Sequence, residues 1–594
     1  MQSAETVLGV LRERGRRGLP LDEIYRQLFN PQLYLLAYGR IYSNKGSMTP
    51  GATGETVDGM SLDKIGRIID ALRHERYRWS PARRIYIPKK GGSKLRPLGL
   101  PPWSDKVVGE VVRLLLEAYY EPTFSERSHG FRPGRGCHTA LREVANTWTG
   151  TTWFIEGDVC DCFGSLDHEV MLSTLAKRIH DNRFLALVRN MLTAGYLEDW
   201  VWNATLSGVP QGGVVSPALS NIYLHRLDEF VETVLIPEYT RGRVRKQDTD
   251  YARVRAARNR AYRRGDHATA RDLRKQLRSM PSGDPRDPGY RRLKYVRYAD
   301  DVLLGFTGPK AEAEEIKQRL AAFLREDLKL ELSQAKTLIT HARTQAARFL
   351  GYEITVIHND RKVGADHRRT VNGTVSLRVP ESVITAKKAP YLARGKPERL
   401  AHLVNEDDHT IVATYGAQWR GIVQYYLLAG NVYRLYRLHW VMETSMLKTL
   451  ANKHRSSVSK MARKFKATID TPHGPRKCFE ARIERSGRKP LVARFGGIPL
   501  RRQKNLVITD PALAPVAARR KQLITRLLAD RCEICRSSDG ISVHHVRRLA
   551  DLTQPGQPQS GWEEIMARRR RKTLVVCRTC HDAIHTGQPL PQLT

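Results

Sequence analysis

"RYADDVLLGF", residues 297–306, places Asp300 and Asp301 side by side between two runs of strand-forming residues. Because successive side chains of a strand point to opposite faces, two adjacent carboxylates can serve one site only if the chain turns there. A second acidic group follows another apolar run in "TTWFIEGDVCDCFGSLDH", residues 151–168, where Asp158 ends the run. Acids at a β-turn are often only solvated turn residues. Carboxylates on neighbouring strand ends can also hold two Mg²⁺ ions for phosphoryl transfer to a nucleotide, and the second acidic group favours this interpretation.

The charge of the chain points to a polyanionic partner. Its 594 residues include 100 Lys and Arg against 61 Asp and Glu, a net charge of +39, and the excess is spread through every segment. Nucleic acid is the expected partner, and a merely solvated basic surface is the alternative. No stretch has the features of a signal peptide and no apolar run approaches ~18 residues, so we expect an intracellular, cytoplasmic protein that binds no membrane.

Composition and periodicity divide the chain into five parts. They are an N-terminal extension, a part with alternating strand-like and helical stretches, a helical part, a basic segment and a Cys/His tail, at residues 1–80, 81–375, 376–475, 476–525 and 526–594. The extension contains a loop rich in Gly, Thr and Pro. The second part has an α+β pattern and carries an Arg-rich insertion, residues 240–292, that predicts two basic helices with a turn at 264–266. The basic segment is weakly patterned, and the tail is too small for a good apolar core of its own.

Further motifs accompany the two acidic groups along the chain. They are "YIPKKGGSKLRPLGLPP", "SHGFRPGRGCHTAL", "GVPQGGVVSPALSNIYLHRLDEF" and "LELSQAKTLI", which begin at residues 86, 128, 208 and 330. This series resembles the reverse transcriptase encoded within group II introns. The helical part is similar to the family's maturase thumb, so the resemblance covers nearly the whole chain. It implies an α+β right-hand polymerase fold, with fingers and palm in the second part, a thumb (maturase X domain) in the helical part, an RNA-binding loop in the extension and a DNA-binding function for the basic segment.

The resemblance also assigns the acids of the polymerase site. It implies that Asp158, Asp300 and Asp301 form the catalytic carboxylate set and hold two Mg²⁺ ions. Asp158 and Asp300 would be the main ligands, and Asp301 a weaker or indirect one. Other residues that match the family's motifs would bind the incoming nucleotide, namely Lys89, Arg96, Phe163, Gln211 and Lys336.

These nucleotide-binding candidates have different expected roles. Lys89 and Arg96 would grip the triphosphate through charge-assisted contacts, with Lys336 close to it. Phe163 would crowd a 2′-hydroxyl and so favour deoxynucleotides, and Gln211 would lie beneath the nascent base pair. The alternatives are that Lys89 and Arg96 are surface charges of a hairpin and that Phe163 is an ordinary core aromatic.

The tail has the spacing of two metal sites. "CEIC" supplies Cys532 and Cys535, and "CRTC" supplies Cys577 and Cys580; two such pairs predict a structural zinc ion held by four cysteines. Interleaved with them are a histidine pair in "VHHV" and two histidines, in "CHDAIH", that are four residues apart. On a helix that spacing places both side chains on one face, where they can ligate one ion.

This arrangement resembles an H-N-H endonuclease of the ββα-metal type. The resemblance implies a divalent metal, expected to be Mg²⁺, on His544, His581 and His585, with His545 as the general base that deprotonates water. The family's middle Asn is missing, and "RRKTLVVC" offers Lys572 or Thr573 in its place, so the orientation of the base stays open. The alternative is a zinc-stapled DNA-binding module without cleavage.

Together these resemblances imply a multifunctional bacterial retroelement enzyme. It would bind its intron RNA as a ribonucleoprotein and promote splicing, nick target DNA, and use the freed 3′-hydroxyl and dNTPs to copy the RNA into DNA. The alternatives are a splicing factor that no longer polymerises, a reverse transcriptase of a retron or defence system, and a protein that is chiefly a DNA endonuclease. The intact acids argue against the first, and the thumb and tail argue against the second.

Overall fold

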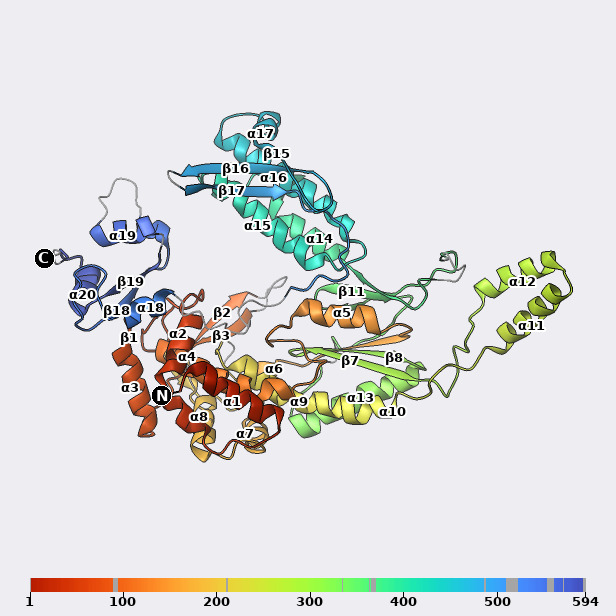
Figure 1. Ribbon diagram of the computed structural model, residues 1–594, viewed down its shortest axis with the longest axis horizontal. Helices are drawn as coiled ribbons and strands as arrows, with labels where there is room; N and C mark the ends of the chain where they lie inside the picture. Colours follow the sequence, from red (N-terminus) through yellow and green to blue (C-terminus); the bar gives the residue numbers. More distant parts are fainter. Residues whose placement is uncertain are drawn as a thin grey trace.

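The structure, a computed structural model, has a mixed α/β fold (Figure 1). It describes residues 2–88, 95–209, 212–333, 335–362, 364, 370–485, 488–508, 522–552, 560–569 and 571–590. No helix among these residues has the length and apolar character needed to cross a membrane. Figure 1 shows a central body, an upper lobe of helices and strands, a tail at one side of the body and a helical hairpin that projects at the other.

The N-terminal helices form one layer of the body. They are α1 (Ala4–Arg16), α2 (Pro31–Ile41), α3 (Leu62–Arg73) and α4 (Trp103–Tyr120). Helices α1 and α3 begin after Ser3 and Ser61, whose hydroxyls accept hydrogen bonds from backbone N–H groups of the first turn. Most residues of α4 are buried, and α1 lies so close to it that a Cβ on Gly15 would be 1.9 Å from Tyr119 O. Glycine is therefore required at this crossing.

A four-stranded antiparallel sheet lies at the centre of the body. Its order is β7 (Arg292–Tyr298), β8 (Asp301–Thr307), β4 (Trp153–Asp158) and β9 (Ile339–His341). Adjacent residues of β8 face different apolar cores. Leu303 belongs to the core that includes α5 (Cys137–Thr147), whereas Val302 belongs to the core that includes α9 (Ser216–Phe230) and α13 (Lys310–Leu328). The sheet is covered on both faces, and its strand ends are fixed between two cores.

A second sheet is built on the hairpin of β2 (Ala82–Pro88) and β3 (Leu95–Leu100). Its order is β3-β2-β5-β6, with β5 at Tyr196–Glu198 and β6 at Val201–Asn203. The short helices that follow β4 are α6 (Cys162–Ser165), α7 (His168–Ala176) and α8 (Asn182–Leu192). The loop before α9 packs tightly on β3, because a Cβ on Gly212 (φ +105°) would lie 2.9 Å from Gly99 O. This contact holds the loop before α9 against β3.

The Arg-rich insertion forms the hairpin that projects from the body in Figure 1. Its helices are α11 (Thr249–Arg263) and α12 (His267–Ser279), and each begins after an Asp whose carboxylate caps the first turn. Gly265 supplies the positive φ, +75°, of the turn between them. Both helices and the turn agree with the sequence-based prediction.

The upper lobe combines helices with a three-stranded sheet. The helices are α14 (Glu381–Lys388), α15 (Asp408–Tyr426), α16 (Tyr436–Lys453) and α17 (Val458–Phe465). The strands are β15 (Lys466–Ile469), β16 (Arg476–Arg485) and β17 (Arg488–Gly496), which form a sheet in that order. The sequence analysis missed β16 and β17, because charged side chains on their exposed positions interrupt the apolar pattern. The hairpin is anchored on α15, where a Cβ on Gly416 would lie 2.0 Å from Arg494 O.

The tail is a ββα unit that docks on the N-terminal extension. It consists of β18 (Ser542–His545), β19 (Thr573–Val576) and α20 (Arg578–Thr586), flanked by α18 (Gln522–Leu528) and α19 (Gly561–Arg569). Strand β1 (Met60–Ser61) pairs antiparallel with β18 and completes a sheet of order β1-β18-β19. The buried residues of the tail belong to the same apolar core as the N-terminal helices. The tail therefore has the small size that the sequence indicates, and the extension supplies the rest of its core.

Candidate functional site

Three acids from distant parts of the chain meet at one end of the central sheet. Asp158, the last residue of β4, is the cross-strand partner of Asp301, the first residue of β8. Asp300 lies in the turn between β7 and β8, where Ala299 adopts a positive φ of +56°. The turn expected from the sequence is present, and it brings Asp300 and Asp301 to the same end of the sheet as Asp158.

The acids are partly buried and repel one another. Burial raises the pKa of Asp301 to about 6, and the charges of Asp300 and Asp158 add to this effect. Burial raises the pKa of Asp300 as well. Lys336 Nζ donates a hydrogen bond to Asp158 Oδ2 at 2.6 Å, which raises the pKa of the lysine. Three partly buried carboxylates at one end of a sheet, one of them already paired with a lysine, offer oxygen ligands that suit divalent ions.

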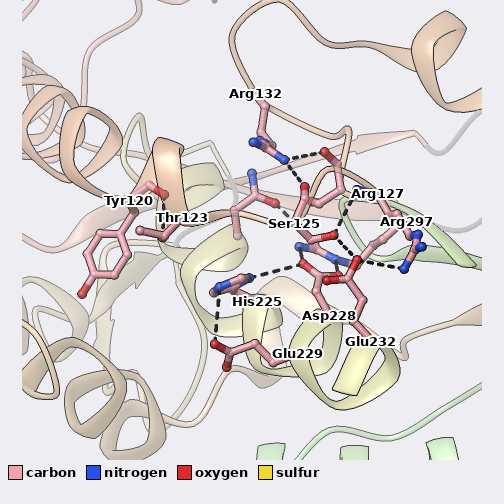
Figure 2. A network of polar contacts seen from close by, with 12 residues as sticks. Tyr120, Thr123, Ser125, Arg127, Arg132, His225, Asp228, Glu229, Glu232 and Arg297 are labelled. Atoms are coloured by element: carbon pink, nitrogen blue, oxygen red, sulfur yellow. Dashed lines mark hydrogen bonds and ion pairs between the residues drawn. The ribbon is translucent and has the colours of Figure 1, made fainter. Parts of the chain in front are cut away.

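A buried ion pair beside the turn that carries Asp300 fixes the backbone of that turn (Figure 2). The Arg297 guanidinium donates to both oxygens of Asp228 on α9, at 2.6 and 2.7 Å, and neither side chain is exposed. The same guanidinium donates to Ala299 O at 2.9 Å and to Asn221 Oδ1 at 3.2 Å. Arg297 therefore ties the backbone of the acidic turn to α9.

Two candidate nucleotide-binding side chains lie near the acids. Arg96, on β3, is exposed, and its charge reaches Asp300. Phe163, at the start of α6, is half-buried, and its ring meets Phe131 edge to face at 6.3 Å between centroids. Of these candidates, Arg96 and Lys336 interact with the acid cluster, whereas Phe163 is placed by its contact with Phe131.

The four tail cysteines converge as expected. Each Sγ of Cys532, Cys535, Cys577 and Cys580 lies within 4.8 Å of the others, and all four are free. The Cys532 sulfur accepts hydrogen bonds from the backbone N–H groups of residues 534 and 535, which hold it in place. Four thiols at this spacing fit a tetrahedral zinc ion.

The histidines of the tail form a second cluster with an acid that the sequence analysis did not select. The ring centroids of His544, His581 and His585 are 4.7 to 5.5 Å apart. The carboxylate of Asp58, in the N-terminal extension, lies with their ring nitrogens in a group whose ligand atoms are all within 4.8 Å of one another. Burial lowers the pKa of His544 to about 4, so its ring is neutral at neutral pH and can ligate a metal.

His545 faces away from this cluster, toward the extension. Its Nε2 is hydrogen-bonded to the Tyr38 hydroxyl at 2.9 Å, and burial lowers the pKa of His545 to about 4, so its ring is neutral at neutral pH. It also lines a cleft of about 860 Å³ whose basic side chains are Lys45, Arg526, Arg547, Arg548, Arg571 and Lys572. A cleft with this lining suits a nucleic-acid backbone.

The two residues at the position of the missing Asn differ in their contacts. Thr573 lies directly opposite His545 in the β18–β19 ladder, and its hydroxyl accepts a hydrogen bond from Arg526 Nη2 at 2.8 Å. Lys572 Nζ instead donates to Arg547 O at 3.2 Å. Thr573 is therefore the neighbour of the candidate base.

Comparisons with known proteins agree with the geometry. Residues 87–354 match the reverse transcriptase (RNA-dependent DNA polymerase) family, residues 376–486 the type II intron maturase family and residues 532–581 the AI2M/AI1M-like HNH endonuclease family. The chain is 37% identical to the group II intron-encoded protein LtrA of Lactococcus lactis subsp. cremoris, over 94% of this chain and 96% of LtrA. The chain belongs to the group II intron-encoded proteins. A putative COX1/OXI3 intron 1 protein of Saccharomyces cerevisiae is 32% identical, over 94% of this chain and 68% of the yeast protein.

This group II intron-encoded protein is a multifunctional enzyme. It joins an RNA-directed DNA polymerase to a maturase domain and an HNH endonuclease domain, which confirms the family and function expected from the sequence. The maturase and polymerase domains imply that it binds intron RNA and nucleic-acid substrates. The maturase and endonuclease matches also argue against the retron-type alternative.

Two nucleotide-binding candidates of the intron-encoded protein, Lys89 and Gln211, lie outside the residues that the structure describes. Two other features became visible only in the fold. Asn221 and Asp228 are polar residues on a largely buried helix. They are seven positions apart and so lie on the same helix face, a pattern that indicates one polar partner for both. Asp58 has no such signal, because its partner His585 is 527 residues away.

Proposed function

We propose that Asp158, Asp300 and Asp301 are the catalytic carboxylates of the polymerase and hold two Mg²⁺ ions, with Asp158 and Asp300 as the main ligands. The observation that carries this proposal is the pairing of Asp158 with Asp301 beside the turn that bears Asp300. Two such ions activate the primer 3′-hydroxyl and stabilise the leaving pyrophosphate. The part of the protein is to keep the three carboxylates in place, which the anchored turn at Arg297 supports.

The same proposal assigns the fold to a right hand. The hairpin β2–β3 would belong to the fingers, the sheet β7-β8-β4-β9 to the palm and helices α14 to α17 to the thumb. Arg96 and Lys336, from opposite sides of the acid cluster, would contact the triphosphate, together with Lys89. Phe163 would close the space beside the 2′ position, and Gln211 would lie under the nascent pair.

For the tail we propose an endonuclease that nicks target DNA. His544, His581 and His585 would hold a divalent metal, His545 would take a proton from the attacking water, and the cysteines would hold a structural zinc ion. The neutral ring of His545 and the basic cleft beside it support this assignment. The nick would supply the 3′-hydroxyl from which the polymerase copies the intron RNA with dNTPs.

Primer extension on an RNA template with Mg²⁺ tests the polymerase assignment. Asp300→Asn is expected to reduce extension by about 1,000-fold or more, because the bound metal ions lower the activation barrier by several kcal/mol and the variant holds them poorly. Asp272→Asn, on the exposed hairpin, is the matched control and should extend like the wild type. Equal extension by the wild type and Asp300→Asn would contradict the assignment.

A nicking assay on double-stranded DNA, scored separately, tests the tail. His545→Ala is expected to reduce nicking by about 100-fold or more, the usual contribution of a general base, while extension is unchanged. Asp300→Asn should show the opposite result. Loss of both activities in either variant would mean that the two sites are not independent.

A further inference from the structure

The extension and the tail meet at the histidine cluster. Strand β1 pairs with β18, and Asp58 lies two residues before β1. Its Oδ2 is 2.8 Å from His585 Nε2 and 3.4 Å from His581 Nε2, and its Oδ1 is 3.4 Å from His544 Nδ1. One carboxylate from the N-terminal extension therefore faces all three candidate metal-binding histidines.

The placement of Asp58 is fixed by the backbone. Gly59 N donates to Val543 O at 3.0 Å, and His545 N donates to Asp58 Oδ1 at 2.7 Å. Gly59 has a positive φ of +72°, which glycine adopts without strain and which turns the chain into β1. The carboxylate is held against β18 before any ion binds.

The histidine cluster lacks partners that a metal ion would supply. Among the described residues, neither ring nitrogen of His544 nor Nε2 of His581 makes a hydrogen bond, although all three atoms are buried. His544 is only 4% exposed. Buried polar atoms of this kind are nearly always satisfied. Two of the three, His544 Nδ1 and His581 Nε2, lie 3.4 Å from the Asp58 carboxylate, whose ion-pair partners in the described chain are histidines. A cation among the four side chains would satisfy one nitrogen of each histidine and the charge of the carboxylate.

We propose that Asp58 is a fourth protein ligand of the endonuclease metal, so that the site is shared between the N-terminal extension and the tail. The inference rests on the metal role proposed for the tail histidines. Three imidazoles and one carboxylate suit a divalent transition metal better than Mg²⁺, which takes mainly oxygen ligands. This donor set therefore changes the expected ion from Mg²⁺ to a divalent transition metal, for which paramagnetic Mn²⁺ serves as the probe.

The shared site couples metal binding to docking of the tail. The histidines all belong to the tail, but the carboxylate reaches them only when β1 is paired with β18. Metal binding therefore stabilises the docked arrangement, and an undocked tail binds the metal more weakly. The N-terminal extension of the same chain therefore supplies a ligand to the metal site of the tail.

Binding of Mn²⁺ to the full-length, zinc-loaded chain tests this proposal. Free Mn²⁺ is measured by electron paramagnetic resonance in an Asp158→Asn/Asp300→Asn background, so that the polymerase acids do not contribute. Asp58→Asn is expected to weaken the affinity of one Mn²⁺ site by more than about 10-fold. Loss of a residue that only hydrogen-bonds to a metal ligand already has an effect of that size, and loss of a ligand itself should have at least the same effect. Asp63→Asn, an exposed acid five residues along, is the matched control and should bind like the parent. Unchanged affinity in Asp58→Asn would overturn the proposal.

A second measurement separates ligation from docking. The rise in Tm that Mn²⁺ produces should be smaller in Asp58→Asn than in the parent, and this difference should exceed any loss of Tm without metal, since the Asn keeps the shape of the side chain but is a much weaker ligand. Equal losses of Tm with and without metal would assign Asp58 to docking alone and overturn the proposal. Nicking by the wild type is scored independently, so absence of nicking with intact Asp58-dependent Mn²⁺ binding would reject the endonuclease role and not the metal site.

Discussion

Lys336 Nζ lies 2.6 Å from Asp158 Oδ2, although the two residues are 178 positions apart. The lysine side chain is 67% exposed, so it is free to leave the carboxylate when cations and a nucleotide arrive. Lys336→Met keeps the aliphatic stem and removes the charge. We expect the KM for dNTPs to rise by about 10-fold or more, the value of a charge-assisted hydrogen bond, with a smaller change in kcat.

Steady-state primer extension at varied dNTP concentration measures this effect. Lys310→Met is the control, since Lys310 is also exposed and lies on α13, where it pairs with Glu314. Because Lys336 is exposed, its removal should leave the Tm unchanged. A KM equal to that of the wild type would show that Lys336 does not contact the nucleotide.

Phe163 is expected to select against ribonucleotides. Its ring packs edge to face on Phe131 and is half-buried, so it is held rigidly enough to exclude an extra hydroxyl. Phe163→Ala should raise incorporation of rNTPs relative to dNTPs by about 10-fold or more, since a steric clash is worth several kcal/mol. Competition between rATP and dATP on one template measures the ratio. Phe479→Ala, at a half-buried aromatic on β16, is the matched control, and an equal ratio in both variants would assign Phe163 to packing.

The zinc site should be separable from the polymerase. Cys580→Ser is expected to lower the zinc content from one ion per chain to none and to abolish nicking, because a small ββα unit depends on its metal. Primer extension should persist, since the polymerase acids lie at the end of another sheet. Cys160→Ser is the control for zinc content, because Cys160 is exposed and free and lies outside the cysteine cluster. Full zinc content in Cys580→Ser would contradict the assignment.

The sequence predicts the parts of this protein that depend on short-range patterns. Adjacent acids in a strand require a turn, and the turn is present at Ala299. Histidines four apart share a helix face, and His581 and His585 do so on α20. The cysteines of each pair are three positions apart, so one turn of the chain brings both sulfur atoms to the same side, as the structure shows.

The remaining features depend on contacts between distant segments. Nothing near Asp58 indicates a metal ligand, because its role is visible only once β1 has paired with β18. Arg297 looks like any basic residue within a strand, and burial against Asp228 gives it a positioning role. Strands β16 and β17 were missed because charged side chains interrupt their pattern, and their few buried residues pack into the core that includes α15.

The buried ion pair between Arg297 and Asp228 should make the stability of the fold around the central sheet sensitive to acid. Burial opposes ionisation of Asp228, but the charge of Arg297 outweighs it and lowers the pKa of Asp228 to about 2. An Asp in an unfolded chain has a pKa of about 3.9. The pair therefore stabilises the fold above about pH 4, and this stabilisation, about 2 to 3 kcal/mol, is lost as the pH falls toward about 2.

Asp228→Asn tests this coupling through urea unfolding at two pH values. At pH 7 the variant leaves the buried Arg297 without a counter-charge, and we expect a loss of about 3 to 5 kcal/mol in the free energy of unfolding. At pH 3 the wild type has lost part of the same interaction, so the difference should narrow by about 1 kcal/mol. Asp327→Asn, half-exposed in its pair with Arg226, should show no such pH dependence. A difference between wild type and Asp228→Asn that is constant from pH 7 to pH 3 would show that Asp228 is not held as a carboxylate by Arg297.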